Sequence, residues 1–206
     1  TRGFVIRASL EEGAADTRTS MSPNEDETSY AVFWNETDCI SVNGIASESI
    51  SIQEDRRSAE FTFLKGFESA LYAVYPASVV SKYESGALTL LLPNVQTWSE
   101  SDQFDPAAAV MLAQAADGAS LRFRHAMAYL RVTLSEASDP EPIAAVVLSA
   151  NDGSALCGAF QATYGSDLWT LTPQESAASQ VELRCGTQGA PLGSRMVIAI
   201  PAGEYA

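Results

Sequence analysis

The chain has 206 residues, 46% of them hydrophobic, so it can bury a sizeable core in one large or two small domains and is not a disordered chain. Its 26 acidic and 12 basic residues give a formal net charge of −14, which repels phosphate backbones and anionic membrane surfaces, so no nucleic-acid partner is expected. No apolar run reaches the roughly 20 residues of a membrane helix, and the first residues lack the hydrophobic region of a signal peptide.

Short runs in which apolar and polar residues alternate predict β-strands throughout the first half of the chain. The first run presents Phe4, Ile6, Ala8 and Leu10 on one face, which is the period of a half-buried strand. Turn residues and prolines separate the runs that follow. These are Tyr30–Trp34, Ile40–Val42, Ile50–Ile52, Phe61–Phe63, Leu71–Tyr75 and Leu88–Leu92.

One segment in the middle of the chain has a helical signature. Asp105 is an N-cap residue, Pro106 fits the first helical position, alanines follow, and Gly118 fits the position just after a helix. Local propensity alone therefore predicts a helix here.

The second half repeats the strand pattern, most clearly at the end of the run Leu121–Leu134. The other runs are Ile143–Leu148, Ala155–Tyr164, Trp169–Leu171, Val181–Cys185 and Met196–Ile200. Many short strands, each with one apolar face, predict an all-β chain of antiparallel β-sandwiches. We place the boundary between two domains, 1–116 and 117–206, in the polar run Gln114–Ser120.

The sequence offers little catalytic chemistry. His125 is the single histidine, and no cysteine or carboxylate lies at metal-ligand spacing from it. We interpret it as structural, and we expect no catalytic, cofactor or metal site and no enzyme. Paired carboxylates for glycoside hydrolysis stay open, because their spacing is spatial. The acidic run Glu25–Glu27 is interpreted as a solvated loop, with a weak calcium contact as the alternative.

The three cysteines are an odd number, lie far apart and form no C-x-x-C motif. We interpret Cys39, Cys157 and Cys185 as small buried apolar residues. A disulfide between Cys157 and Cys185 is the alternative in an oxidising compartment, so cysteine usage does not identify the compartment.

Several segments together resemble one family, the fimbrillin-like proteins of Bacteroidales, which are subunits of surface pili. In chain order they are Asp16–Ser20 with Ala31–Val42, Leu71–Pro76, Leu92–Gln96, Phe123–Leu134 and Ile198–Tyr205. Each motif alone is weak, and the resemblance depends on their order and spacing over nearly the whole chain. Glu36-Thr37 departs from the family pattern, which has a glycine directly before the position of Asp38.

This resemblance implies two transthyretin-like antiparallel β-sandwich domains in tandem. It also implies export to the outer-membrane surface, often as a lipoprotein, and a role as fimbrial subunit or accessory tip adhesin. The partners would be other fimbrial subunits and a host or bacterial surface receptor. The family further implies an extended crossing between the domains, so we expect a short strand near Val110–Ala113 in place of the helix.

Assembly in this family proceeds by donor-strand exchange, in which an arginine-directed protease removes an N-terminal strand. The resemblance places the cut at Arg18 and makes Phe4–Leu10 the removable strand, with Phe4, Ile6, Ala8 and Leu10 as candidate groove-filling residues. Arg7 is the alternative processing site. The competing interpretation is an ordinary first strand that is never cut. The strand-like run before Ala206 also leads us to expect further strands beyond this sequence.

The alternative function is a monomeric surface glycan-binding module on a β-sandwich. It would require an exposed aromatic platform, and the three tryptophans are the candidates: Trp34, Trp98 and Trp169. We favour core packing for these residues, because two of them lie in strand patterns.

Overall fold

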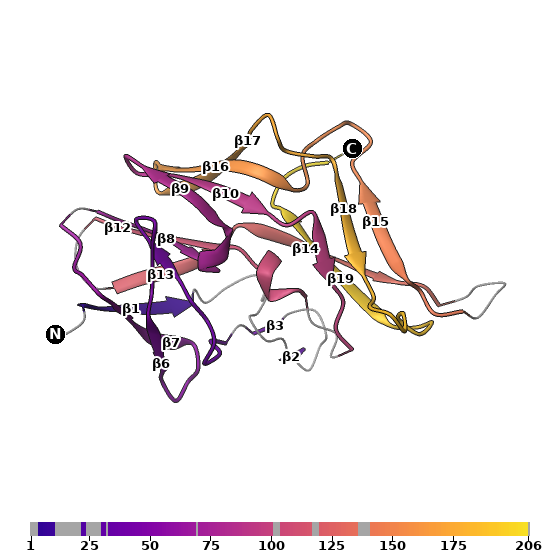
Figure 1. Ribbon diagram of the computed structural model, residues 1–206, viewed down its shortest axis with the longest axis horizontal. Helices are drawn as coiled ribbons and strands as arrows, with labels where there is room; N and C mark the ends of the chain where they lie inside the picture. The colour runs from indigo at the N-terminus through magenta and orange to yellow at the C-terminus, as the bar shows by residue number, and fades with distance from the viewer. Residues whose placement is uncertain are drawn as a thin grey trace.

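The computed structural model describes residues 4–10, 22–23, 30–31, 33–68, 70–100, 104–116, 120–135 and 141–205. These residues are nearly all β-structure, which confirms the all-β prediction. Only two short 3-10 helices accompany the strands in the described segments, η1 (Ala77–Val79) and η2 (Pro106–Ala108). Figure 1 shows the early strands gathered at one end of the molecule and the last strands at the other.

The largest sheet has eight strands and curls like half a barrel. Its spatial order is β5 (Ile45–Ala46), β4 (Ser41–Val42), β8 (Leu71–Tyr75), β12 (Met111–Ala115), β13 (Ser120–His125), β1 (Phe4–Leu10), β7 (Ser58–Phe63) and β6 (Ser49–Ile52). Neighbouring strands are antiparallel except β1 and β13, which run parallel with Arg7 opposite Ser120. The first strand of the chain therefore lies in the interior of this sheet.

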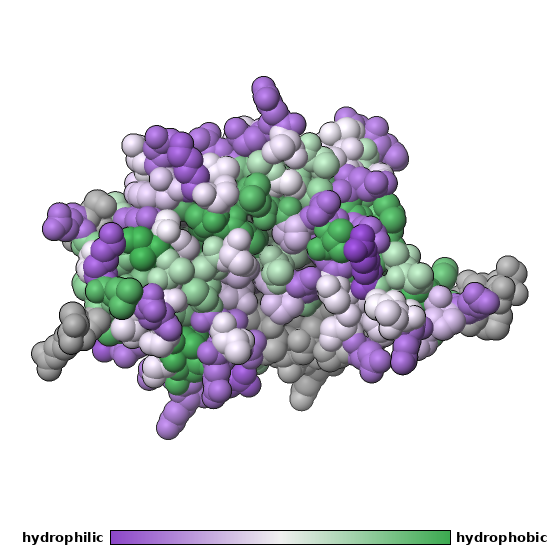
Figure 2. Space-filling model, viewed as in Figure 1, coloured by the Kyte–Doolittle hydropathy of each residue, from purple (hydrophilic) through white to green (hydrophobic). Residues whose placement is uncertain are grey.

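Four smaller sheets complete the described structure. One has the order β17 (Leu168–Pro173), β16 (Gly158–Gly165), β10 (Ala87–Leu92) and β9 (Val80–Glu84); another has β11 (Val95–Thr97), β18 (Gln180–Arg184) and β15 (Ala145–Ser149). The two-stranded sheets are β14 (Met127–Thr133) with β19 (Arg195–Pro201), and β2 (Ser22–Pro23) with β3 (Tyr30–Ala31). Figure 2 shows hydrophilic residues around the rim of one face and hydrophobic ones over its middle.

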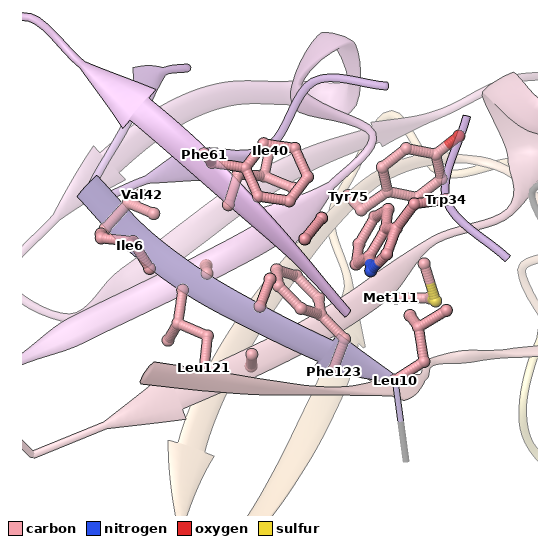
Figure 3. Packing of buried hydrophobic residues seen from close by; sticks show 14 of the residues in the cluster. Ile6, Leu10, Trp34, Ile40, Val42, Phe61, Tyr75, Met111, Leu121 and Phe123 are labelled. Carbon is pink, nitrogen blue, oxygen red and sulfur yellow. The ribbon is translucent and has the colours of Figure 1, made fainter. Parts of the chain in front are cut away.

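The core on one face of the eight-stranded sheet is organised around Trp34 (Figure 3). This indole is fully buried and meets the rings of Phe61, Tyr75 and Phe123 edge-on at 5.2, 5.6 and 5.7 Å. Its Nε1–H donates to the carbonyl oxygen of Arg57 at 3.1 Å, so the polar atom of the buried ring is satisfied.

A buried phenol adds a polar contact to the same core. The hydroxyl of Tyr75 donates to Oδ1 of Asp38 at 2.9 Å. Burial, followed by the negative charge of Asp38, raises the pKa of the Tyr75 phenol far above its ordinary value. The neutral phenol is therefore the form that this core holds.

Two further clusters hold the smaller sheets in place. One lies between the other face of the eight-stranded sheet and the β17–β16–β10–β9 sheet, where Leu112 and Val74 join Leu90 and Phe160. The other joins the β11–β18–β15 sheet to the β14–β19 pair. Each face of the large sheet thus has its own apolar cover.

The edge of β19 that faces away from β14 is closed by two side chains, one on β11 and one just after it. Gln96 is buried, and its Nε2 donates to the carbonyl oxygen of Ala199 at 2.7 Å. The Ala199 N–H donates back to Oε1 of Gln96 at 2.9 Å. Two residues further, Nε1–H of Trp98 donates to the carbonyl oxygen of Arg195 at 3.0 Å. A side-chain amide and an indole therefore satisfy backbone groups that a neighbouring strand would otherwise satisfy.

The alanine-rich segment after Asp105 is a strand, so the helix predicted from propensity is wrong and the expectation of a strand near Val110–Ala113 is confirmed. The capping signal is real but local: Oδ1 of Asp105 accepts from the Ala107 N–H at 2.9 Å, and the helix ends after one 3-10 turn. Residues 108–113 are all buried, and Met111 and Leu112 pack into the cores on opposite faces of the sheet. Two-sided burial outweighs helix propensity here.

Strand pairing runs across the predicted division between residues 1–116 and 117–206. Strand β13 pairs with β1 and β12, β16 pairs with β10, and β18 pairs with β11. Residues from both halves of the sequence therefore build the same sheets.

Candidate functional site

The first candidate site is the position that β1 occupies between two other strands of the eight-stranded sheet. On one side β1 pairs with β7, from Phe4 opposite Phe63 to Ser9 opposite Ser58. On the other side it pairs with β13. Because neighbouring strands lie about 4.8 Å apart, β7 and β13 enclose a slot roughly 10 Å wide that β1 fills.

The side chains that β1 presents to the core are those that the sequence singled out. Ile6, Ala8 and Leu10 are buried, and Phe4 is half-buried. Phe4 meets the ring of Phe67 edge-on at 5.8 Å. Figure 3 shows Ile6 and Leu10 pointing into the cluster that surrounds Trp34.

The energy that holds β1 in this slot is mainly hydrophobic. Full burial of an aliphatic side chain stabilises a fold by roughly 1.5–3 kcal/mol, so Ile6 and Leu10 together contribute about 3–6 kcal/mol. Two backbone ladders add to this, although each hydrogen bond contributes only about 1 kcal/mol net. An empty slot would expose both this apolar floor and two unpaired strand edges.

The face of β1 that points away from the core is exposed to solvent. Arg7 Nε donates to Oε1 of Glu60 at 3.1 Å, and the Arg7 side chain is 77% exposed. Its backbone, however, is paired on both sides, opposite Glu60 and Ser120. A protease that needs an extended, unpaired backbone finds none at Arg7 while the sheet is intact. Arg18, the predicted processing site, and the acidic run Glu25–Glu27 lie outside the described residues.

A second candidate site is a groove of about 830 Å³, which we call the β17 groove. One wall is β17 itself, with the half-buried Trp169 packed against Tyr164 at a ring distance of 5.4 Å. Arg122 and Arg124 of β13 also line the groove, as do residues 201–205. Its lining combines aromatic, guanidinium and carboxylate groups, since Asp167 and Glu204 lie in it as well.

The remaining predicted residues are dispersed. His125 lines the β17 groove at the end of β13, with its ring 6.1 Å from that of Tyr129. The tryptophans belong to three different clusters: Trp34 lies in the core of the large sheet, Trp169 packs beside the β17–β16–β10–β9 sheet, and Trp98 packs beside β18 and β19. They do not form one shared sugar-stacking platform.

The cysteines are free thiols, so the alternative disulfide between Cys157 and Cys185 is not formed. Those two are buried, as interpreted from the sequence, whereas Cys39 is only half-buried. Burial raises the pKa of the Cys157 and Cys185 thiols, which disfavours the reactive thiolate. Their Sγ atoms behave as packing groups, and that of Cys157 lies 3.0 Å from the carbonyl oxygen of Gln180.

Two further properties concern the described residues alone. They contain no cluster of three or more His, Cys, Asp or Glu side chains arranged to hold a metal ion. They also contain no helix with the length and apolar character needed to cross a membrane.

The sequence placed Gln96 in the motif Leu92–Gln96 but did not predict its contact with Ala199, and it did not predict the β17 groove. A single glutamine in a strand pattern carries no signal that its amide is buried against another strand. The aromatic residues of the groove resemble ordinary strand residues in the sequence. Comparison of the chain with protein-family models, with curated proteins and with solved structures found no match.

Proposed function

We propose that the chain is a fimbrial subunit or accessory adhesin that assembles at the bacterial cell surface by exchanging β1 for a strand of a neighbouring subunit. The observation that supports this is the position of β1, the first strand, in the interior of the eight-stranded sheet. Its apolar residues are buried and both of its edges are paired. If β1 is removed, the slot that it leaves between β7 and β13 can hold a replacement strand.

Strand replacement restores what removal takes away. Without β1, the edges of β7 and β13 would lack backbone partners, and the apolar floor beneath Ile6 and Leu10 would meet water. An extended segment from a second subunit can supply both the hydrogen bonds and the burial, which is β-augmentation. Filling the empty slot recovers about 25 cal/mol per Å² of apolar surface that removal of β1 exposed.

The finer parts of this proposal come from the sequence resemblance to the fimbrillin-like family. They are two transthyretin-like sandwiches in tandem, export to the outer-membrane surface, often as a lipoprotein, and binding to a host or bacterial receptor. The order of motifs, including Leu71–Pro76 on β8 and Phe123–Leu134 over β13 and β14, supports them.

Two cleavage experiments test the proposal. Limited trypsin digestion followed by mass spectrometry asks whether the chain is cut at Arg18, with Arg18→Gln as the uncut control. In a second variant, residues 13–18 are replaced by the recognition sequence of a specific protease, so that the strand can be released wherever natural cutting occurs. After cleavage, a cycle of mild urea and dilution lets β1 leave, and light scattering measures the mass.

Cleaved protein should form oligomers, whereas the uncut chain should stay monomeric through the same cycle. A synthetic peptide of residues 1–12 should refill the slot and suppress the oligomers, and the same peptide with Ile6→Asp should not, because a buried unpaired carboxylate is costly. A chain that is cut, loses its first strand and remains a folded monomer would overturn strand exchange. Trypsin resistance at Arg18 alone would overturn only that processing site.

A further inference from the structure

Three aromatic rings of the large core form a bridge across the slot that β1 fills. Phe61 belongs to β7 on one side of the slot, and Phe123 belongs to β13 on the other side. The indole of Trp34 contacts both of these rings, at centroid distances of 5.2 and 5.7 Å. The rings belong to the same buried cluster as the inward side chains of β1, so the bridge lies over the core face of β1.

The strand register shows which residue of β1 lies at the bridge. Phe61 is the partner of Ile6 in the β1–β7 ladder, and Phe123 is the partner of Leu10 in the β1–β13 ladder. A connection between these two rings therefore crosses β1 between Ile6 and Leu10. Because alternate residues of a strand share a face, the residue that points to the core there is Ala8. Figure 3 shows the three labelled rings between Ile6 and Leu10.

This packing encloses the methyl group of Ala8. The residue is 2% exposed, and its partners in the two ladders, Ala59 and Leu121, are buried as well. Protein interiors are close-packed, so added carbon atoms at such a position force neighbouring side chains out of their rotamers or shift the backbone. A leucine at this position would have to displace the rings of the bridge.

Trp34 is held in place by groups that do not belong to β1. Its backbone N–H donates to the carbonyl oxygen of Arg56 at 2.7 Å, and its indole N–H donates to that of Arg57 at 3.1 Å. The Arg57 carbonyl oxygen also accepts from the N–H of Leu10 at 3.1 Å, so one acceptor joins the indole and the backbone of β1. Removal of β1 takes away neither of the two bonds that hold Trp34. An incoming strand therefore meets the same bridge that β1 meets.

We infer that the β1 slot selects its replacement strand by the size of one side chain. The strand that it accepts is an extended segment with alanine or glycine at the position of Ala8. Two residues before and two residues after, this segment has large aliphatic side chains, as β1 has Ile6 and Leu10. Trp34 determines this specificity. The inference rests on the strand exchange proposed above.

The same contact sets the register of the incoming strand. A shift by one residue turns its apolar side chains to the solvent, and a shift by two residues places a large side chain at the position of Ala8. One register alone therefore satisfies both the face and the bridge.

The test uses the cleavable variant described above. After cleavage, the released strand is removed by size-exclusion chromatography in urea, and the protein is diluted into a fluorescently labelled peptide of residues 1–12. Anisotropy then measures the affinity of unlabelled competitor peptides. The Ala8→Leu peptide should bind at least about tenfold more weakly than the native peptide, which corresponds to 1.4 kcal/mol. The Val5→Phe peptide is the matched control, because it enlarges a side chain on the exposed face, and it should bind within about threefold of the native peptide.

A change in the protein tests whether the bridge causes the selection. Trp34→Leu makes room at the position of Ala8 and should reduce the ratio of the two affinities, native peptide over Ala8→Leu peptide, by at least about threefold. If Trp34→Leu does not fold, Phe61→Leu removes one end of the bridge and should have the same effect.

The outcomes separate this inference from strand exchange. Equal binding of the native and Ala8→Leu peptides would overturn the inference and leave strand exchange standing, and so would an unchanged ratio in the folded bridge variant. If the native peptide itself does not bind to the strand-free protein, strand exchange is wrong, and the inference is wrong with it.

Discussion

Gln96 is the residue whose substitution tests the assembly of the small sheets most directly. Gln96→Met keeps the length of the side chain and its apolar stem but removes the amide. In the native protein this amide accepts from the Ala199 N–H and donates to the Ala199 carbonyl oxygen, at 2.9 and 2.7 Å. Both Ala199 and Gln96 are buried, so solvent does not replace the lost partner without rearrangement.

The expected loss of stability follows from the N–H and the carbonyl oxygen of Ala199, which both lose their hydrogen-bond partner. A buried donor or acceptor without a partner costs about 1–3 kcal/mol, so Gln96→Met should lower the free energy of unfolding by roughly 2–6 kcal/mol. For a chain of this size, each kcal/mol lowers Tm by about 2–4 °C. Gln161→Met on the exposed face of β16 is the matched control and should change stability by less than about 0.5 kcal/mol.

Urea unfolding followed by tryptophan fluorescence measures the difference, since Trp98 lies next to the perturbed strand. If Gln96→Met is as stable as Gln161→Met, the side-chain amide does not stabilise the edge of β19, and the account given for this interface is wrong.

The substitution Gln96→Glu gives a pH-dependent version of the test. When protonated, the introduced carboxyl group can donate and accept as the amide does, whereas its ionised form would be buried opposite the Ala199 carbonyl oxygen. Burial should therefore raise the folded pKa of this carboxyl group above the unfolded value of about 4.3. The stability that the protonated carboxyl group provides is fully present below the unfolded pKa and is lost as pH rises through the folded pKa. Relative to Gln161→Glu, the variant should thus be most stable in acid.

Four other outcomes are expected. Trp34→Ala should lower the free energy of unfolding by about 3–5 kcal/mol, because the indole is fully buried among three aromatic rings; a loss below about 1 kcal/mol in urea unfolding would contradict this. Tyr75 should stay protonated in an absorbance titration of the folded protein through the range near pH 10 in which the tyrosines of an unfolded chain ionise. The pKa of Tyr75 is higher in the folded chain than in the unfolded chain, so the stability that this phenol provides is lost as pH rises beyond that range. If all seven tyrosines ionise together within that range, the burial argument is wrong. Cys157 and Cys185 should react with a thiol reagent far more slowly in the folded protein than in urea, and equal rates would show that these thiols are accessible. His125→Asn should leave assembly after cleavage intact, and a folded variant that no longer assembles would assign this side chain a role in assembly.

The period of the hydrophobic pattern predicted most strands correctly, because burial of one face is a local property of the sequence. The segment after Asp105 shows where local information fails. Its N-cap and alanines favour a helix, yet residues 111–115 lie between β8 and β13 with apolar cover on both faces. The resemblance supplied the correct expectation here, and propensity did not.

Pairing partners and polar contacts across the fold could not be predicted. The parallel pairing of β1 with β13 depends on which edges meet in space, and sequence periodicity contains no such information. The same holds for the amide of Gln96, which a strand pattern cannot distinguish from a solvent-exposed glutamine. The aromatic residues of β17 were visible in the sequence, but their common groove with Arg122 and Arg124 arises only from the topology.

The parallel pairing of β1 with β13 also sets the order in which the chain can fold. Arg7 cannot meet Ser120 until that much of the polypeptide has emerged from the ribosome. Until then β1 can form only its antiparallel ladder with β7, and its other edge is unsatisfied. Such long-range closure is slow, so nascent chains should pass through a stage in which this edge is open to other molecules, and a chaperone that covers extended apolar strands would act at this stage.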